Sequence, residues 1–327
     1  MQFTRRTLLQ SAAAASLVAG LPLARAQSLD VARMYGGFAA GGSVDTLSRR
    51  FAEKLAPEYA KAVLVEPKPG AGGQLAISVT KGSPPDGRHM VVTPMSMLCI
   101  YPHTFRKLPY DPVADLTPVS VLANFECGFG VGPAVPAEVR TVPQFLAWAK
   151  ANPAKASFGS PGAGSSVHFI GMLLGRDAGV ELTHVGYRGS QPAMLDMMGG
   201  QLPAISAPLG EFLPHLSSGK VRLLGTSGPR RSPFAPNVAT YTEQGFKNMV
   251  FEEQFSLYLP AGASPAVVER LHQHTVRAMA APEVAAGLAT FAIVPATSTP
   301  AELAALQKHD LERWAPVVKA IGFTADS

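Results

Sequence analysis

Hydrophobic positions along the chain follow two different periods, which predicts a succession of strands and helices. Short apolar runs at 31–35, 62–65 and 89–93 have the length of strands. Residues 44–55 instead repeat their apolar side chains at steps of three and four, as an amphipathic helix does. Because strands alternate with helices, the pattern favours an α/β fold with parallel strands and crossover helices.

The alternation continues to the end of the chain. Strands are predicted at 156–159, 182–185, 202–206 and 221–226, and helices at 141–151, 191–198, 265–279 and 300–320. Residues 101–118 are rich in proline and tyrosine, and we expect a surface connection there. The apolar run 251–259 is predicted to return the chain to the first of two domains.

Four glycine-rich loops each follow a predicted strand and precede a helical pattern. They are residues 36–46, 70–73, 162–166 and 186–190, called here the first to fourth glycine loops. The first amides of a helix lack acceptors and carry partial positive charge, so such turns suit a carboxylate or phosphate. Ligands of open α/β sheets sit beyond the carboxyl ends of the strands, where all four loops are expected.

The first 26 residues have the features of an export signal. Arg5 and Arg6 precede an apolar stretch at 8–23, and residues 24–26 form an A-x-A cleavage pattern. The arginine pair resembles a twin-arginine signal. A membrane anchor is the alternative, but the run is short and contains Gln10 and a proline. We therefore expect the mature chain in the periplasm.

Net charge and cysteine content exclude some function classes. The formal charge of +5 includes three arginines of the signal and no acid there, so the mature chain carries 25 − 23 = +2. Without a basic run or stripe, nucleic acid is not an expected partner. Cys99 and Cys127 either pair in an oxidising compartment or stay buried as small apolar residues. No cysteine and histidine spacing predicts a zinc site, and no cofactor is expected.

Seven short motifs follow one another along the chain, at 41–45, 69–73, 85–87, 108–112, 160–168, 187–190 and 218–222. The ordered set resembles the tripartite tricarboxylate transporter substrate-binding proteins, also called the Bug family. The resemblance implies a type II-like periplasmic binding protein fold, with two α/β lobes and mixed sheets around a ligand cleft. One lobe would comprise 27–124 and 252–327, and the other 125–251.

The resemblance also implies a function without catalysis. Such a protein captures a small organic carboxylate and passes it to the membrane permease subunits of a tripartite tricarboxylate-type transporter, and we expect a monomer. Backbone amides and serine hydroxyls would hold the ligand. The implied ligand-binding residues are Phe38, Ala39, Ala40, Gly41, Ser43, Asp45, Gly70, Ala71 and Ser96 in one lobe, and Ser160, Gly162, Gly164, Ser165, Ser166, His168, Tyr187, Gly189 and Ser190 in the other.

The chain departs from the family pattern at several places. Residues 66–67 replace the usual Glu-Asn, Gly186 replaces a proline, and 207–208 lack a common aspartate. Residues 253–255 stand where a tryptophan is common. Several of these positions are expected at the pocket wall, so the identity of the carboxylate does not transfer from the family.

Four candidate residues have two interpretations each. Asp45 contacts a polar or cationic ligand group, or it stabilises the dipole of its own helix. His168 lines the cleft or covers the loop beside it. Tyr187 is expected to wall the ligand site, whereas Arg188 either pairs with a carboxylate or is exposed.

Two other function classes are considered. A periplasmic hydrolase would use Ser165 or Ser166 with His168, but no G-x-S-x-G elbow occurs, and a serine so near its histidine on one helix makes a poor triad. A signalling or orphan receptor for a carboxylate is the closer alternative, which the sequence does not distinguish from a transport receptor.

Overall fold

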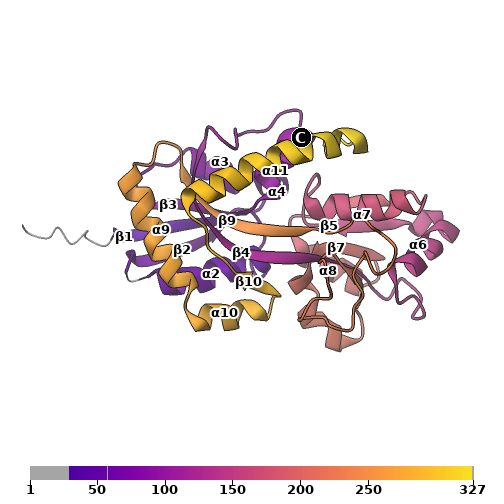
Figure 1. Ribbon diagram of the computed structural model, residues 1–327. Helices are drawn as coiled ribbons and strands as arrows, with labels where there is room; N and C mark the ends of the chain where they lie inside the picture. The colour runs from indigo at the N-terminus through magenta and orange to yellow at the C-terminus, as the bar shows by residue number, and fades with distance from the viewer. Residues whose placement is uncertain (1–28, 57, 326–327) are drawn as a thin grey trace, which may run out of the picture.

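The computed structural model describes residues 29–56 and 58–325 and shows two α/β lobes joined by long crossing strands (Figure 1). The predicted export signal lies outside the described residues. The strands are β1 (Leu29–Gly36), β2 (Ala60–Pro67), β3 (His89–Pro94), β4 (Leu116–Val131), β5 (Ser157–Ser160), β6 (Thr183–Gly186), β7 (Ala204–Pro208), β8 (Arg222–Thr226), β9 (Glu252–Pro260) and β10 (Ile293–Pro295).

Helices cover both lobes and follow the strands closely along the chain. They are α2 (Ser43–Leu55), α3 (Gln74–Lys81), α4 (Ser96–Cys99), α5 (Tyr101–Thr104), α6 (Val142–Ala151), α7 (Ser166–Asp177), α8 (Ser190–Met198), α9 (Pro265–Met279), α10 (Pro282–Ala289) and α11 (Pro300–Ile321). Within the described ranges, no helix is both long and apolar enough to cross a membrane.

The sheets contain both parallel and antiparallel pairs. In the first lobe β1 lies parallel between β2 and β3, and β9 runs antiparallel between β3 and β4. In the second lobe β5 is parallel to β6 and β7, while β7 and β8 are antiparallel to β4. This mixed topology confirms the predicted α/β class with two lobes.

Strand β4 belongs to both lobes and changes its partner on the way. It pairs with β9 as far as Glu126, and from Cys127 onward it pairs with β7. This change of partner lies just beyond the predicted lobe boundary at 124/125. Which residues belong to which lobe stays a prediction. Alternate residues on β4 and β9 near this point can therefore face the space between the lobes.

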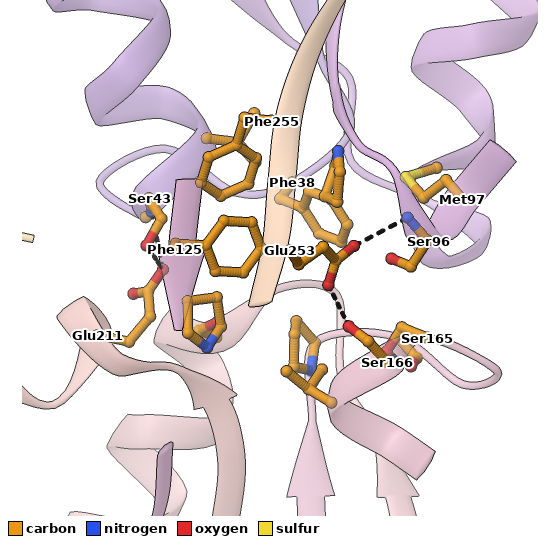
Figure 2. A pocket seen from close by; sticks show the side chains of 18 of the residues that line it. Phe38, Ser43, Ser96, Met97, Phe125, Ser165, Ser166, Glu211, Glu253 and Phe255 are labelled. Carbon is orange, nitrogen blue, oxygen red and sulfur yellow. Dashed lines mark hydrogen bonds between the residues drawn. The ribbon is translucent and has the colours of Figure 1, made fainter. Parts of the chain in front are cut away.

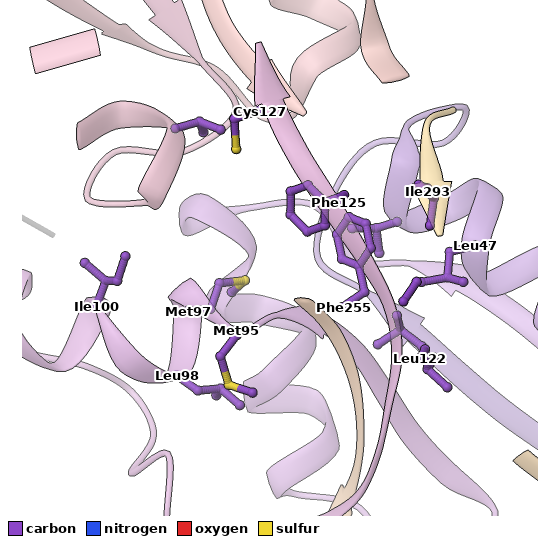
Figure 3. Packing of buried hydrophobic residues seen from close by; sticks show 14 of the residues in the cluster. Leu47, Met95, Met97, Leu98, Ile100, Leu122, Phe125, Cys127, Phe255 and Ile293 are labelled. Carbon is purple, nitrogen blue, oxygen red and sulfur yellow. The ribbon is translucent and has the colours of Figure 1, made fainter. Parts of the chain in front are cut away.

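Hydrophobic side chains pack around the crossing (Figure 3). Phe125 of β4 and Phe255 of β9 are both buried, and their rings stack with centroids 4.1 Å apart. The short helix α4 places Met97 and Leu98 in the same core. The junction of the two lobes is thus a packed interior, which fixes where the crossing strands lie.

The predicted surface connection at 101–118 is wrong in its first part. Tyr101 and Tyr110 are buried. Each tyrosine hydroxyl donates a hydrogen bond to a backbone carbonyl, at 2.9 Å to Gly72 and 2.6 Å to Met97. Because the hydroxyls find acceptors inside, the rings can be buried although the composition suggested a loop.

A capping signal in the sequence marks the start of the helix predicted at 141–151. The hydroxyl of Thr141 accepts a hydrogen bond from the Gln144 amide, and the Gln144 side chain accepts from the Thr141 amide, which makes a capping box at the start of α6. This confirms Thr141 as the N-cap. The short helix α10 and strand β10 were not predicted, and β10 adds to the edge of β4.

We predict two reactive thiols per chain. Cys99 and Cys127 are both buried and free of a disulfide, so the structure supports the apolar alternative rather than a bridge. Titration of the purified protein with a thiol reagent, in denaturant and without reductant, should therefore count two thiols. A count of zero that rises to two after reduction would contradict the structure.

Candidate functional site

A pocket lies between the two lobes, where the crossing strands pass (Figure 2). It contains about 560 Å³ of space free of protein atoms, which includes its opening to solvent. Its wall is built from the first, third and fourth glycine loops, from α4, and from the parts of β4, β7 and β9 nearest the crossing.

The two glycine loops of the first lobe touch each other. A Cβ atom built on Gly37 would lie only 2.6 Å from the carbonyl oxygen of Gly73, well inside normal contact distance. Any larger residue at position 37 would therefore push the first and second loops apart. Glycine is used here for close approach of two backbones.

The loops also meet across the lobes. A Cβ on Gly162 would lie 3.5 Å from the Cα of Gly72, and one on Gly189 would lie 3.2 Å from the amide nitrogen of Ala39. The third loop thus faces the second, and the fourth faces the first. The four loops converge on one place, which the sequence could not show.

Three helices of at least two turns begin at the pocket. Their first residues line it, namely Ser43 and Val44 of α2, Ser166 and Val167 of α7, and Ser190 and Gln191 of α8. The first amides of a helix have no acceptor inside that helix, and its dipole adds partial positive charge there. One helix comes from the first lobe and two come from the second.

Glu211 occupies the start of α2. One carboxylate oxygen accepts hydrogen bonds from the Ser43 amide and the Ser43 hydroxyl, both at 2.8 Å, and the other accepts from the Gln191 side chain at 2.8 Å. Glu211 follows β7 in the second lobe, whereas Ser43 belongs to the first (Figure 2). A carboxylate of the protein therefore sits where the sequence predicted that a ligand carboxylate would bind.

Glu253 on β9 is placed in a similar way. One oxygen accepts from the Ser96 amide of the first lobe at 2.8 Å, and the other accepts from the Ser166 hydroxyl at the start of α7. Glu253 points into the pocket together with Phe255, because alternate residues of a strand share one face.

Both glutamates are almost fully buried, with 2 % and 7 % of Glu211 and Glu253 exposed. Burial raises the pKa of each carboxyl above its ordinary value, and the hydrogen bonds just described offset part of that rise. The negative charge of Asp310 adds to the upward shift of the Glu253 pKa.

The structure places part of the predicted ligand-binding set in the pocket wall. The lining residues from that set are Phe38, Ala39, Ser43, Ser96, Gly162, Ser165, Ser166 and Ser190. They come from three glycine loops and from α4. The first and third glycine loops contribute three of these residues each, and the third loop supplies both Ser165 and Ser166.

The other predicted residues lie outside the lining: Ala40, Gly41, Asp45, Gly70, Ala71, Ser160, Gly164, His168, Tyr187 and Gly189. Asp45 accepts a hydrogen bond from the Gly41 amide at 3.0 Å and pairs with Arg49 at 2.9 Å, so it stabilises its own loop and helix. The Tyr187 hydroxyl donates to Asp196 at 2.8 Å, which turns it toward α8 rather than into the pocket.

His168 lies behind the third glycine loop and holds it in shape. Its Nδ1 accepts a hydrogen bond from the Gly164 amide at 2.9 Å, which requires that nitrogen to be unprotonated. Its ring lies 3.8 Å from the ring of His184, whose Nε2 is 2.7 Å from the Ser160 hydroxyl. The structure therefore supports the interpretation that His168 covers the loop.

Sequence reasoning did not select Glu211, Glu253, Phe125 or Phe255 as site residues. One signal was present for the pair on β9, since 253–255 depart from the family pattern and Glu253 interrupts an apolar strand. Glu211 carries no comparable local signal, because an acid after a strand is usually exposed.

The fold and the pocket define the class of protein, a two-lobed solute-binding protein. A family model described as "Tripartite tricarboxylate transporter family receptor" matches residues 47–323. The chain therefore belongs to this receptor family, whose members are substrate-binding proteins rather than enzymes. This confirms the resemblance seen in the sequence.

Individual relatives agree with the family. "UPF0065 protein in gbd 5'region" of Cupriavidus necator is 32% identical over 292 residues, covering 89% of this chain and 87% of that protein. A solved "periplasmic transporter" is 31% identical with a TM-score of 0.84, covering 90% and 98%. MatC of Rhodopseudomonas palustris with bound malate is 25% identical with a TM-score of 0.80, covering 91% and 100%.

We predict that the protein loses stability as the pH falls below about 6.5. Burial lowers the pKa of His184 to about 4 and, with the neighbouring His184 charge, that of His168 to about 2. As the pH falls, the unfolded chain thus takes up protons at a higher pH than the folded chain does. Each histidine then removes up to about 1.4 kcal/mol of unfolding free energy per pH unit, until the pH reaches its folded pKa.

Urea unfolding at a series of pH values measures this slope. The variant His184→Gln keeps a polar group for the Ser160 hydroxyl but cannot take up a proton, so its stability should fall less steeply. Equal slopes for the variant and the wild type would contradict the assignment.

Proposed function

We propose that this protein is a periplasmic receptor that captures a small organic carboxylate and delivers it to the membrane permease subunits of a tripartite tricarboxylate-type transporter. The observation that carries the proposal is the meeting of three helix starts, from both lobes, at one pocket. Lobes closing on a ligand at such a place would exclude water from it.

Glu211 takes the Ser43 backbone amide at the start of α2, whereas at the starts of α7 and α8 the glutamates take only the Ser166 hydroxyl and the Gln191 side chain. The backbone amides at the starts of α7 and α8 are therefore the carboxylate site that we propose. Four backbone amides are available there, from Ser166, Val167, Ser190 and Gln191, and the two helix dipoles favour negative charge. Hydrogen bonds to a charged group contribute about 1.5–3 kcal/mol each. The bound malate of the Rhodopseudomonas palustris relative supports a carboxylate as ligand.

The proposed periplasmic location rests on the N-terminal residues and on the family. The twin-arginine-like signal at 1–26 would export the chain, with cleavage after Ala26, and the family is that of transporter receptors. The mature chain would act as a monomer. We infer no role for a cofactor in ligand capture.

We predict that removing one backbone amide at α8 weakens carboxylate binding. Proline is tolerated at the first position of a helix, and Gly189 before it has an extended ψ of 168° that a following proline accepts. Ser190→Pro should therefore leave α8 intact but delete one amide donor. We expect it to bind pentanoate, which carries a single carboxylate, at least about tenfold more weakly than Ser190→Ala does, measured by calorimetry.

Ser190→Ala is the matched control, because both variants lose the hydroxyl and only the proline also loses the amide. Thermal unfolding without ligand checks that both variants are folded. Equal affinity of two folded variants would mean that the carboxylate is not held at the start of α8.

A further inference from the structure

The pocket has an acidic half that the proposed carboxylate site does not explain. Among the described residues that line it, the ionisable side chains are Glu211 and Glu253, with no lysine, arginine or histidine. Neither glutamate forms an ion pair within the described part of the chain, and their recorded partners are serine and glutamine groups. A buried carboxylate without a counter-ion is costly, so the site favours an added positive charge.

Donors on this half are already in use. The Ser43 amide and hydroxyl donate to Glu211, and the Ser96 amide donates to Glu253. A second ligand carboxylate placed here would meet two acidic groups and few remaining donors. At the starts of α7 and α8 the glutamates take only side-chain donors, the Ser166 hydroxyl and the Gln191 side chain, and within the described residues the first backbone amides of both helices have no protein acceptor. Those backbone amides favour a carboxylate, whereas the space beside the two glutamates favours a cation.

Aromatic rings lie between the two glutamates. Phe38, Phe125 and Phe255 line the pocket, and Figure 2 shows the Phe125 ring between Glu211 and Glu253 with the Phe255 ring next to it. Those two rings are stacked nearly parallel, at 16°. Aromatic faces attract cations through their negative quadrupole, and nearby carboxylates add to that attraction.

We propose that Glu211 and Glu253 make this receptor selective for organic acids that also carry a cationic nitrogen, and that they exclude acids with a second carboxylate. The ligand carboxylate binds at α7 and α8, and its ammonium group lies among the two glutamates and the phenylalanine rings. This inference rests on the proposed function, since it assumes a carboxylate at the helix starts.

Calorimetric titration of the mature chain at neutral pH with two matched sets of acids tests the inference. The aliphatic set is γ-aminobutyrate, pentanoate and glutarate, and the aromatic set is p-(aminomethyl)benzoate, p-ethylbenzoate and p-(carboxymethyl)benzoate. Within a set the acids share a carboxylate and a spacer, and the far end changes from ammonium to methyl to carboxylate. We expect the ammonium acid to bind at least about tenfold more tightly than the dicarboxylate in at least one set.

The two proposals fail in different ways. A dicarboxylate that binds at least as tightly as its ammonium counterpart in every set that binds would overturn the inference and leave the carboxylate receptor standing. Absence of binding by all six acids would overturn the proposed function, and the inference with it.

Glutamine variants assign the selectivity to the two side chains. Glu211→Gln and Glu253→Gln should each lower the preference for ammonium acid over dicarboxylate by about tenfold, partly through a gain in dicarboxylate affinity. A gain in affinity cannot come from a misfolded protein. Glu126→Gln is the matched control, because Glu126 is a part-buried glutamate on β4 outside the pocket lining, and its preference should equal that of the wild type. An unchanged preference in both pocket variants would overturn the assignment.

Discussion

The first amides of a helix need acceptors, and in this protein that requirement shapes the contact between the lobes. Glu211 of the second lobe satisfies the start of α2 in the first lobe, and Glu253 joins Ser96 of the first lobe to Ser166 of the second. Each carboxylate therefore acts across the cleft. Because these contacts join the two lobes, the groups that connect the lobes in this structure also line the pocket.

Close approach of backbones is the second condition for this arrangement. The glycine loops touch within and across the lobes at points where a Cβ would collide or crowd. The backbones of these loops can therefore reach the pocket, beside the phenylalanine, serine and glutamate side chains that line it. A wall of this kind suits a carboxylate in general but distinguishes poorly between one acid and another, so discrimination must come from the few side chains that project into the space.

The sequence predicted the parts of this site that depend on local pattern. The strand, glycine loop and helix units could be read from apolar periodicity and glycine positions, and the serines at 165–166 lie at the pocket as expected. What could not be predicted depends on contacts distant in sequence. Glu211 meets Ser43 across 168 positions, and Glu253 meets Ser96 across 157. Tyr187 was assigned to the pocket because it lies in a glycine loop, but its hydroxyl is drawn away by Asp196 nine positions later.

Fold and ligand choice are therefore carried by different parts of the chain. The glycine loops and helix starts, which carry the family resemblance, bring backbone amides to the pocket. The rest of the wall includes the side chains of Glu253 and Phe255, within a segment that departs from the family pattern. A substitution there alters the charge that a ligand meets without moving a strand or a loop. One scaffold can in this way keep its carboxylate anchor while its second contact changes from one member to another, and in this chain that contact is acidic and aromatic.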